Sequence, residues 1–471
     1  TQLYASGVIL SPDVATPGIV TNTGSLGMGI SKAKGMVLAN RLAGRDSRVF
    51  VMTGDGELQE GQFWESLVSG TNFGLHEIVV IVDHNKLQSD TFVKNVSDLG
   101  DLEAKLAAFG WVVGRCSGHD IAALDATLRG LEAGGNRPKI IIADTVKGRG
   151  VSFMEHTSLD SDVAMYRFHS GAPDAVNYRR AAQELLDRIG QRLAALGAAP
   201  LAVETVTRPA TAPATNVVQR MIPAYSAALL ALADRHPELV ALDADLILDT
   251  GLIPFREKHP DRFIECGIAE QDMVSMAGGM ALNGLTPVVH SFACFLSSRP
   301  NEQIYNNATE HTRVVYVGSL AGAVPGGPGH SHQAVRDISS LAGVPGMVLL
   351  EPSCEAEVAM ALDYCVETHP GPSYLRLSIP CDIPYALPAG YTLRPGRGVT
   401  LTEGRDALLI AYGPVMLPSA WRAARKLAAD HGIGVTVVNL PWLNLVDADW
   451  LAGLAADFAH VVTIDNHYIT G

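Results

Sequence analysis

The stretch from Val49 to Leu87 limits what this chain can fold into more than any other part of the sequence. It predicts a buried strand over Val49–Met52, a tight turn at Gly54-Asp55-Gly56, an amphipathic helix from about Glu57 to Phe73, and a second buried strand over Ile78–Val82. Continuous apolar strands joined by a helix are typical of a parallel sheet. The stretch is therefore predicted to be a βαβ unit with acidic and amide side chains at the carboxyl ends of both strands.

Two of those polar side chains are candidate metal ligands. Asp55 follows the first strand and Asn85 follows the second, about thirty residues later. Ligands of open α/β sheets bind at the carboxyl ends of strands, so we expect these two side chains to converge. With a peptide carbonyl such as that of Leu87, they leave room in an octahedral Mg²⁺ shell for two diphosphate oxygens and a water. Gly54 and Gly56 are expected to let the backbone bend sharply and approach phosphate.

The full pattern resembles a known cofactor motif. Gly54-Asp55-Gly56 followed by Asn85 is similar to the thiamine diphosphate motif, and GDGELQEGQFWES with NKLQSD resembles its version in transketolases. The resemblance extends over nearly the whole chain. It implies an enzyme that binds thiamine diphosphate with Mg²⁺, or with Ca²⁺ or Mn²⁺ in its place. It also implies that Glu57 is a cofactor-binding residue and that Glu60 is an acidic residue linking the two active sites of a dimer.

Composition bounds the remaining possibilities. At 471 residues the chain is too long for one core, and a content of 47% hydrophobic and 18% charged residues indicates a folded protein rather than a disordered one. The formal charge of −14 argues against nucleic acid and anionic membrane as partners. No apolar run is long enough to predict a membrane-spanning helix. Six scattered cysteines without CxxC spacing are typical of buried thiols, so the expected location is the cytoplasm.

A glycine-rich segment precedes the central stretch. The sequence GSLGMG leads into a helix predicted over Ile30–Leu42, where backbone amides can contact phosphate. By resemblance to the GSLGxG segment of transketolases, Gly24 and Leu26 are expected to bind the cofactor. Later in the chain, His169 lies where transketolases carry a histidine that faces the thiazolium ring. A histidine in a loop is more often only solvated, and its catalytic role here is implied by the resemblance.

The second half of the chain carries another group of candidates. Glu270 is expected in the first turn of a Gly/Ala-rich helix, where a carboxylate ordinarily complements the helix dipole. The similarity of ECGIAEQDMVSMAGG to the cofactor-activating helix of transketolases implies instead that Glu270 shares a proton with the pyrimidine ring nitrogen. Phe292 and Phe295 are more often core residues at such spacing; the resemblance implies that they hold the aminopyrimidine. His332 is placed by resemblance, like His169, to exchange protons with substrate oxygens.

We expect an α/β fold: tandem thiamine diphosphate-binding domains with parallel sheets flanked by helices, plus a partial C-terminal α/β domain. The Ala-, Pro- and Thr-rich segment over residues 194–215 is predicted to be a linker. The expected domains are therefore a diphosphate-binding domain over 1–193, a pyrimidine-binding domain over 216–395 and a C-terminal domain over 396–471 that ends early. The family resemblance implies a homodimer with its active sites at the subunit interface.

Several substrate-binding positions depart from the transketolase pattern. The aspartate that recognises a sugar hydroxyl aligns with Pro328, and the phosphate-binding arginine of the family's SR pair aligns with Ile379. Polar substrate ligands after one strand are replaced by the aliphatic run over 246–248. Arg376 and Arg220 are nearby residues that could restore phosphate binding. These changes predict a substrate less polar than a sugar phosphate.

The resulting prediction is a transketolase-like transferase. It would move a two-carbon ketol, or a related acyl unit, from a ketose or 2-oxo donor to an aldehyde-type acceptor. Three alternatives stay open: an ordinary transketolase acting on sugar phosphates, an enzyme like deoxyxylulose-phosphate synthase, and a non-catalytic binding partner. The presence of Asp55, Asn85 and Glu270 together argues against the last, because a relic would be free to lose any of them.

Overall fold

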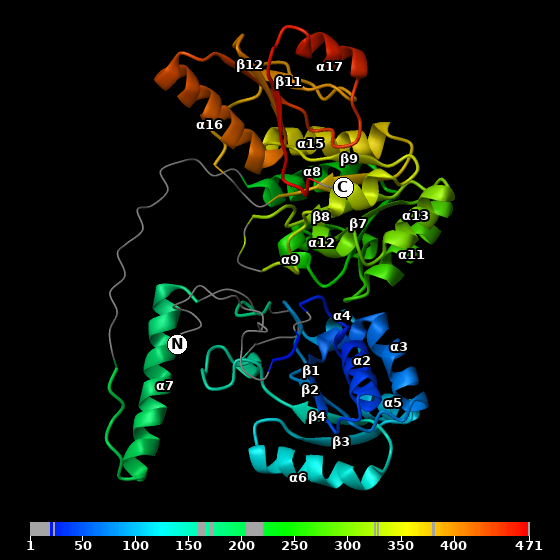
Figure 1. The fold of residues 1–471 in the computed structure, drawn as a ribbon, viewed down its shortest axis with the longest axis vertical. Coiled ribbons are helices and arrows are strands. Elements are labelled where there is room, and N and C mark those ends of the chain that lie inside the picture. The colour runs from blue at the N-terminus through cyan, green and yellow to red at the C-terminus, as the bar shows by residue number, and fades with distance from the viewer. Residues whose placement is uncertain are drawn as a thin grey trace. The chain divides into compact units, whose positions relative to one another are not determined.

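The computed structural model describes residues 19–21, 24–158, 165–169, 173–203, 220–324, 326, 329–378 and 382–469. The chain divides into two compact units, one of Leu26–Thr215 and one of Asn216–Gly471 with Thr1–Ser25 (Figure 1). Pro328, Ile379 and the greater part of the predicted linker lie outside the described residues. Within the part that is described, no helix has the length and apolar character needed to cross a bilayer.

The unit that begins at Leu26 is built on a four-stranded parallel sheet in the order β1-β2-β4-β3. Its strands are β1 (Val49–Gly54), β2 (Ile78–His84), β3 (Val112–Ser117) and β4 (Lys139–Asp144). Its α-helices are α2 (Gly29–Leu42), α3 (Gly61–Asn72), α4 (Val93–Val96), α5 (Leu102–Ala108), α6 (Ile121–Leu131) and α7 (Ala175–Ala195). The expected parallel sheet is confirmed, and β3 is a strand that the apolar pattern did not predict.

Both faces of this sheet carry apolar clusters because residues alternate along buried strands. The larger cluster joins α2, α3 and α5 to the strands through residues such as Ile30, Leu67, Leu106 and Val80. Trp111 is 2% exposed within it, and its indole N–H donates to the backbone oxygen of Leu67 at 3.0 Å. A smaller cluster joins α6 to the opposite face. This packing fixes the strand ends that carry the candidate metal ligands.

The other unit contains a six-stranded parallel sheet in the order β6-β5-β7-β8-β10-β9. Its strands are β5 (Leu239–Asp243), β6 (Phe263–Glu265), β7 (Thr286–Phe292), β8 (Val315–Ser319), β9 (Val348–Leu350) and β10 (Ser373–Arg376). Its α-helices are α8 (Met221–Arg235), α9 (Ile247–Thr250), α10 (Ile253–Lys258), α11 (Glu270–Leu282), α12 (Ala293–Leu296), α13 (Asn301–Thr309), α14 (Asp337–Ala342) and α15 (Glu355–Asp363).

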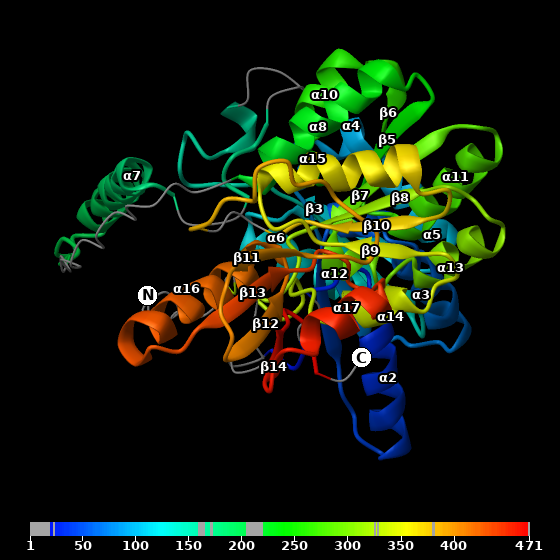
Figure 2. The same cartoon turned by 90° about the horizontal axis from the view of Figure 1, so that it is seen from above.

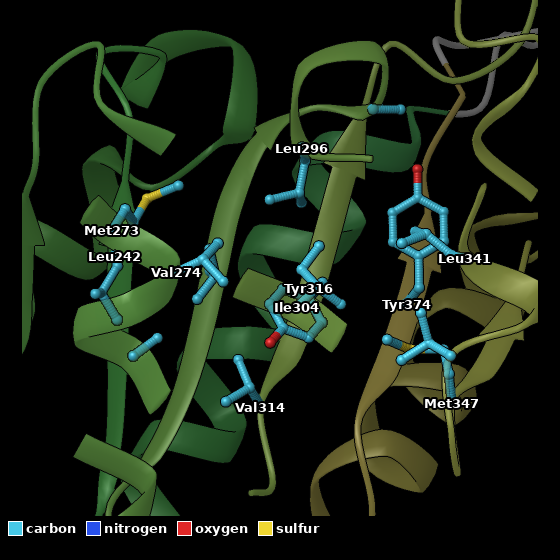
Figure 3. Close-up of a cluster of buried hydrophobic side chains, with 14 of the residues drawn as sticks. Leu242, Met273, Val274, Leu296, Ile304, Val314, Tyr316, Leu341, Met347 and Tyr374 are labelled. Carbon is cyan, nitrogen blue, oxygen red and sulfur yellow. The ribbon is translucent and has the colours of Figure 1, made fainter. Parts of the chain in front are cut away.

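The core of this second sheet lies between the strands and helices α11 to α14. Met273 and Val274 of α11 pack with Leu242 of β5, Ile304 of α13 and Tyr316 of β8, and all five are fully buried (Figure 3). Burial of this much apolar surface stabilises the position of α11, whose first residue is Glu270.

A third, four-stranded sheet completes this unit, in the order β11-β13-β12-β14. Its elements are β11 (Val399–Thr402), β12 (Ala407–Ala411), α16 (Gly413–His431), β13 (Val435–Asn439), α17 (Ala448–Ala455) and β14 (Val461–Ile464). Figure 2 shows α16 and α17 on opposite sides of the sheet, in agreement with the separate apolar clusters that each helix forms with it. β11 runs antiparallel to β13, whereas the other pairs are parallel. The predicted fold class is confirmed, and this antiparallel edge strand is an addition to it.

Candidate active site

The two strand ends predicted to hold a metal are tied together by Asp55. Its backbone N–H donates to the carbonyl of Asp83 at 3.3 Å, across the β1–β2 pair. Its carboxylate, 1% exposed, accepts from the N–H of Gly56 at 2.9 Å and from the N–H of Lys86 at 2.5 Å. Lys86 lies between Asn85 and Leu87, so the second hydrogen bond holds the loop that carries both of these predicted ligands against Asp55.

The loop after β2 adopts a backbone conformation that non-glycine residues rarely take. Lys86 has a φ of 68°. Such a conformation costs on the order of 1–3 kcal/mol and persists only where surrounding contacts enforce it. The contacts here are the hydrogen bond from Lys86 to Asp55 and one of 3.0 Å from the N–H of Val93 to the Lys86 carbonyl. Strain of this kind is common at ligand-binding loops.

The electrostatics of Asp55 fit a bound cation. Burial raises the pKa of this carboxyl to about 6, against the opposing effect of its backbone hydrogen bonds from Lys86 and Gly56. The described residues include no lysine or arginine in an ion pair with it, and a divalent cation would supply the missing charge. They also contain no group of three His, Cys, Asp or Glu residues suited to a metal. A metal here therefore depends on oxygens of Asn85 and Leu87 as well.

Glu57 connects the glycine-rich loop to the Gly-Asp-Gly turn. One carboxylate oxygen accepts from the Gly27 N–H at 2.8 Å, and the other accepts from the Thr53 hydroxyl at 2.6 Å. The structure thus gives Glu57 a supporting contact behind the predicted phosphate-binding backbone. The turn before Gly27 contains Leu26, which is half-buried, as is Gly24.

The need for glycine lies at other positions than expected. The chain bends at Asp55 as expected, but neither Gly54 nor Gly56 has a positive φ, so the bend does not depend on the left-handed conformation that favours glycine. The chain turns instead by passing from β1 into a 3₁₀ turn over Gly56–Gln59, before α3. Gly27 has a φ of +83°, and a Cβ there would lie 2.9 Å from the Cβ of Glu60. Glu60, which is 9% exposed, has an extended backbone between the 3₁₀ turn and α3. The helix expected to run from Glu57 is interrupted at this residue.

His169 lies beside a lysine that the sequence did not single out for this role. Its ring Nδ1 is 2.7 Å from the Nζ atom of Lys147, which also donates to the backbone oxygen of Gln88 at 2.7 Å. The protein packed around the ring, together with the Lys147 ammonium, lowers the pKa of His169 to about 4, although part of the side chain remains accessible to water. His169 is therefore neutral near pH 7 and can accept a proton.

In the other unit, Glu270 is the first residue of α11 and is 2% exposed. One of its carboxylate oxygens, Oε1, is 2.7 Å from the Nη1 atom of Arg299. The other oxygen, Oε2, is buried and has no hydrogen-bond partner among the described residues. A buried acceptor without a donor is costly. The donor set of thiamine diphosphate fits this position, because a protonated pyrimidine nitrogen would satisfy Oε2.

The predicted aromatic pair and His332 lie together. The ring centroids of Phe292 and Phe295 are 6.0 Å apart, and the His332 ring lies 6.0 Å from the first and 5.1 Å from the second. Burial and the nearby Arg299 lower the pKa of His332, so it is also neutral near pH 7. The Arg299 guanidinium lies 4.2 Å from the Phe295 ring centroid. Arg299 therefore joins the predicted residues into one cluster.

Sequence reasoning missed Arg299. A cation four residues after an aromatic side chain in a helical segment was the available signal, since such residues lie on the same face. The backbone N–H of Arg299 indeed donates to the carbonyl of Phe295 at 2.9 Å. Its contact with Glu270, which is far away in the sequence, gave no signal of this kind.

Arg376 is not available to bind phosphate. It is fully buried between two carboxylates, those of Asp337 and Glu351. Its remaining guanidinium N–H groups donate to the backbone oxygens of Ala334 at 2.8 Å and Asn466 at 3.0 Å. The suggestion that Arg376 restores phosphate binding is therefore wrong. Arg220, in contrast, is exposed at the start of α8.

The sequence matches three domain families, all of them transketolase domains. The matches are "Transketolase, thiamine diphosphate binding domain" over residues 8–164, "Transketolase, pyrimidine binding domain" over residues 219–379 and "Transketolase, C-terminal domain" over residues 396–471. Together they place both halves of the candidate site within domains of one kind of protein. The chain belongs to the transketolase family, as its motifs predicted.

Individual relatives are similar over nearly the whole chain. Transketolase-like protein 2 of Mus musculus is 29% identical over 461 residues, which are 95% of this chain and 72% of that protein. Transketolase of Mus musculus is 29% identical over 462 residues, which are 95% of this chain and 71% of that protein. Among solved structures, transketolase from Leishmania mexicana is similar with a TM-score of 0.49 and 22% identity, covering 97% of this chain and 76% of that chain.

Proposed function

We propose that this protein is a transketolase-type transferase that uses thiamine diphosphate and Mg²⁺. It would transfer a two-carbon ketol, or a related acyl unit, from a ketose or 2-oxo donor to an aldehyde-type acceptor. The observation that carries the proposal is the buried Oε2 of Glu270, which lacks a donor in a cluster with Phe292 and Phe295. Bound thiamine diphosphate supplies a carbanion at its thiazolium carbon and an electron sink.

Each residue of this cluster has a chemical task. Oε2 of Glu270 would accept the hydrogen bond of the pyrimidine ring nitrogen and share its proton, which is the proton switch that the reaction needs. Phe292 and Phe295 would hold the ring between apolar surfaces. His332, neutral near pH 7, would exchange protons with substrate oxygens.

The diphosphate side would depend on the unit that begins at Leu26, together with the segment that carries Gly24. Asp55, the amide oxygen of Asn85 and the Leu87 carbonyl would bind Mg²⁺, because hard oxygen ligands suit this ion. The backbone around Gly24, Leu26, Gly54 and Gly56 would face the phosphates, with Glu57 supporting the loop from behind. His169 would act as a second proton acceptor, and Glu60 would link the two sites of a dimer.

The burial of Arg376 between two carboxylates supports a donor substrate without phosphate. A buried phosphate needs a cationic partner to offset its desolvation. Arg376 already neutralises two buried carboxylates, and Ile379 stands where the family's phosphate-binding arginine is expected. A smaller or less polar donor than a sugar phosphate is therefore proposed.

We also propose the organisation that the family resemblance implies. The domain boundaries are those predicted from the sequence, and the active unit is a homodimer in which the diphosphate-binding domain of one subunit meets the pyrimidine-binding domain of the other. Small-molecule substrates, rather than nucleic acid or membrane, are the proposed partners, and the proposed location is the cytoplasm.

An ordinary transketolase acting on sugar phosphates is the second candidate, and the exposed Arg220 favours it. A guanidinium there could bind a substrate phosphate from a different direction. Arg220 is thus the residue on which the two candidates make opposite predictions.

The test compares kcat/KM for xylulose 5-phosphate with kcat/KM for unphosphorylated ketols and 2-oxo acids, in the wild type and in Arg220→Met. Preference for the unphosphorylated donors, unchanged in the variant, supports our proposal. A kcat/KM on the order of 10⁴ M⁻¹s⁻¹ or more for xylulose 5-phosphate alone, lost in Arg220→Met, would establish the ordinary transketolase instead. Arg235→Met, which removes an exposed arginine at the other end of α8, serves as the matched control.

A further inference from the structure

We propose that Arg299 is the positioning residue of the proton switch: its guanidinium binds one oxygen of an ionised Glu270 and leaves the other oxygen to the pyrimidine nitrogen. This inference rests on the proposed use of thiamine diphosphate. Arg299 acts through Glu270, and no contact between Arg299 and substrate is required.

The geometry of the ion pair separates the two carboxylate oxygens. Nη1 of Arg299 lies 2.7 Å from Oε1 of Glu270, while Oε2 remains buried without a partner. The exposed fractions are 12% for the Arg299 side chain and 2% for that of Glu270, so water competes little for this contact. Charge-assisted hydrogen bonds in such surroundings are strong and directional. The pair therefore fixes the orientation in which Glu270 presents Oε2.

Arg299 is itself held from three sides. Its backbone N–H donates to the carbonyl of Phe295 at 2.9 Å, and its backbone carbonyl accepts from the side-chain amide of Gln271 at 3.2 Å. Its guanidinium lies 4.2 Å from the centroid of the Phe295 ring, where the ring face attracts a cation. Because Gln271 follows Glu270 directly, these contacts link the arginine to the start of α11 independently of the ion pair.

The charge of Arg299 governs where a proton resides before the cofactor binds. A buried carboxylate whose cationic partner is removed becomes costly and takes up a proton. Other titratable groups near Glu270 include Asp272 on the same helix and the Cys294 thiol, whose pKa burial raises to about 12, so that it stays neutral. Burial and the Arg299 charge lower the pKa of His332, so this ring is neutral near pH 7. Arg299 is thus the cation that directly pairs with the Glu270 carboxylate.

This arrangement makes a prediction about protons. If Arg299 holds Glu270 as a carboxylate, as proposed, binding of thiamine diphosphate to the wild type takes one proton from solvent into the pair formed by Oε2 and the ring nitrogen. Without the Arg299 charge, Glu270 already carries that proton, and uptake falls. The experiment is calorimetric titration of the full chain with thiamine diphosphate and Mg²⁺ at pH 7, in two buffers of different ionisation enthalpy, which gives the number of protons exchanged per site.

Four variants sharpen the measurement. Arg299→Met should take up fewer protons than the wild type, by an amount on the order of one per site. Arg299→Lys should restore the uptake because it restores the charge, while cofactor affinity stays reduced because an ammonium lacks the planar fork. Arg299→Gln removes the charge but keeps a donor, and it replaces Arg299→Met if that variant does not fold. Arg262→Met is the matched control, since Arg262 lies over the Phe255 ring at 6.0 Å and donates to backbone carbonyls.

A second readout is the pH dependence of thiazolium proton exchange. Its acidic limb should move to higher pH in Arg299→Met and return in Arg299→Lys. A folded Arg299→Met variant with wild-type proton uptake and an unmoved acidic limb would overturn the inference about Arg299. Wild-type exchange in Glu270→Gln, or no binding of thiamine diphosphate to the wild type, would overturn the proposed function itself, and the inference with it.

Discussion

The guanidinium of Arg376 donates a hydrogen bond of 3.0 Å to the backbone carbonyl of Asn466, a residue that follows the last strand of the third sheet. The side-chain oxygen of Asn466 also accepts from the N–H of Ala323 at 3.2 Å. The Arg376 guanidinium also donates to the backbone carbonyl of Ala334. Asn466 is therefore bonded directly to Ala323, which precedes His332, and through Arg376 to Ala334, which follows it. The C-terminal part of the chain therefore helps to hold the loop that carries a proposed catalytic residue.

The first prediction is that Arg376→Met destabilises the protein strongly. The substitution leaves Asp337 and Glu351 buried without their cation, and loss of one partner of a buried ion pair typically costs about 3–5 kcal/mol. Urea unfolding would measure the loss. Arg235→Met, which breaks pairs of half-exposed side chains, is the control and should cost at most about 1 kcal/mol. Equal effects of the two substitutions would show that the buried pair is dispensable.

The second prediction concerns the glycine-rich loop. Gly27→Ala should destabilise the protein more than Gly44→Ala, although both positions have a positive φ. The left-handed conformation alone costs an alanine roughly 1–2 kcal/mol. At Gly27 the new Cβ also lies 2.9 Å from the Cβ of Glu60, whereas at Gly44 it meets nothing within 4 Å. Thermal unfolding with a titration of thiamine diphosphate would test this, because only Gly27→Ala should also weaken cofactor affinity.

The third prediction is that thiamine diphosphate binding requires a divalent metal and Asp55. Asp55→Ala removes a charged metal ligand and should abolish cofactor binding at micromolar concentrations. Isothermal titration with and without a chelator gives the affinity. Asp125→Ala removes an exposed carboxylate of the same unit and should bind like the wild type. Undiminished binding by Asp55→Ala, or by the wild type in excess chelator, would rule out the metal site.

The fourth prediction follows from a dimer with shared sites. Mixing Asp55→Ala subunits with Glu270→Gln subunits should place both defects in one site and leave the other site intact. The mixed dimer should therefore regain up to about half of the wild-type activity, while each parent dimer stays inactive. The measurement is activity after co-purification through two different affinity tags. A mixed dimer that forms but stays inactive would place each complete site within a single subunit.

The fifth prediction is a pH dependence of stability that arises from His290. In this fully buried, neutral ring, Nδ1–H donates to the Leu242 carbonyl at 2.9 Å and Nε2 accepts from the Tyr225 hydroxyl at 2.6 Å. Burial lowers the pKa of the ring to about 4. An unfolded histidine has a pKa near 6.5. The unfolded state therefore binds more protons between about pH 4 and pH 6.5, and stability falls as the pH falls through this window.

The size of this effect is roughly 3 kcal/mol, from the difference between the two pKa values. Asp243, beside His290 in the sheet, has a raised pKa and acts in the opposite direction. The informative quantity is therefore the free energy of unfolding of the wild type minus that of His290→Gln, measured by urea titration from pH 4 to pH 8. A difference that does not change with pH would contradict the prediction.

Most of the fold followed from apolar runs, and the exceptions have physical reasons. The strands at the centre of each sheet are buried on both faces, so their sequences are continuous and apolar. β3 was missed because Gly114 and Arg115 interrupt its apolar run, and its residues are only partly buried at the edge of the sheet. β11 likewise lies at the edge of its sheet, and its apolar residues alternate with threonines.

The candidate site was predictable where it depends on local motifs. The turn at Asp55 and the helix start at Glu270 are each formed by consecutive residues, so the local sequence was enough to predict their backbone conformation. The contacts of Lys147 with His169 and of Arg299 with Glu270 join segments that are distant in sequence, and no local pattern announces them. The complete burial of Arg376 was also unpredictable, because a single charged residue in a strand is usually at the surface.

If thiamine diphosphate satisfies the orphaned oxygen of Glu270, as proposed, the cofactor is a partner in folding as well as in chemistry. A ligand that satisfies this atom in the folded chain, and has nothing equivalent to bind in the unfolded chain, shifts the equilibrium toward the folded form in proportion to its free concentration. The lifetime of the protein in a cell would then depend on the supply of thiamine diphosphate. Starvation for the vitamin would lower the amount of this protein through proteolysis, without any change in its synthesis.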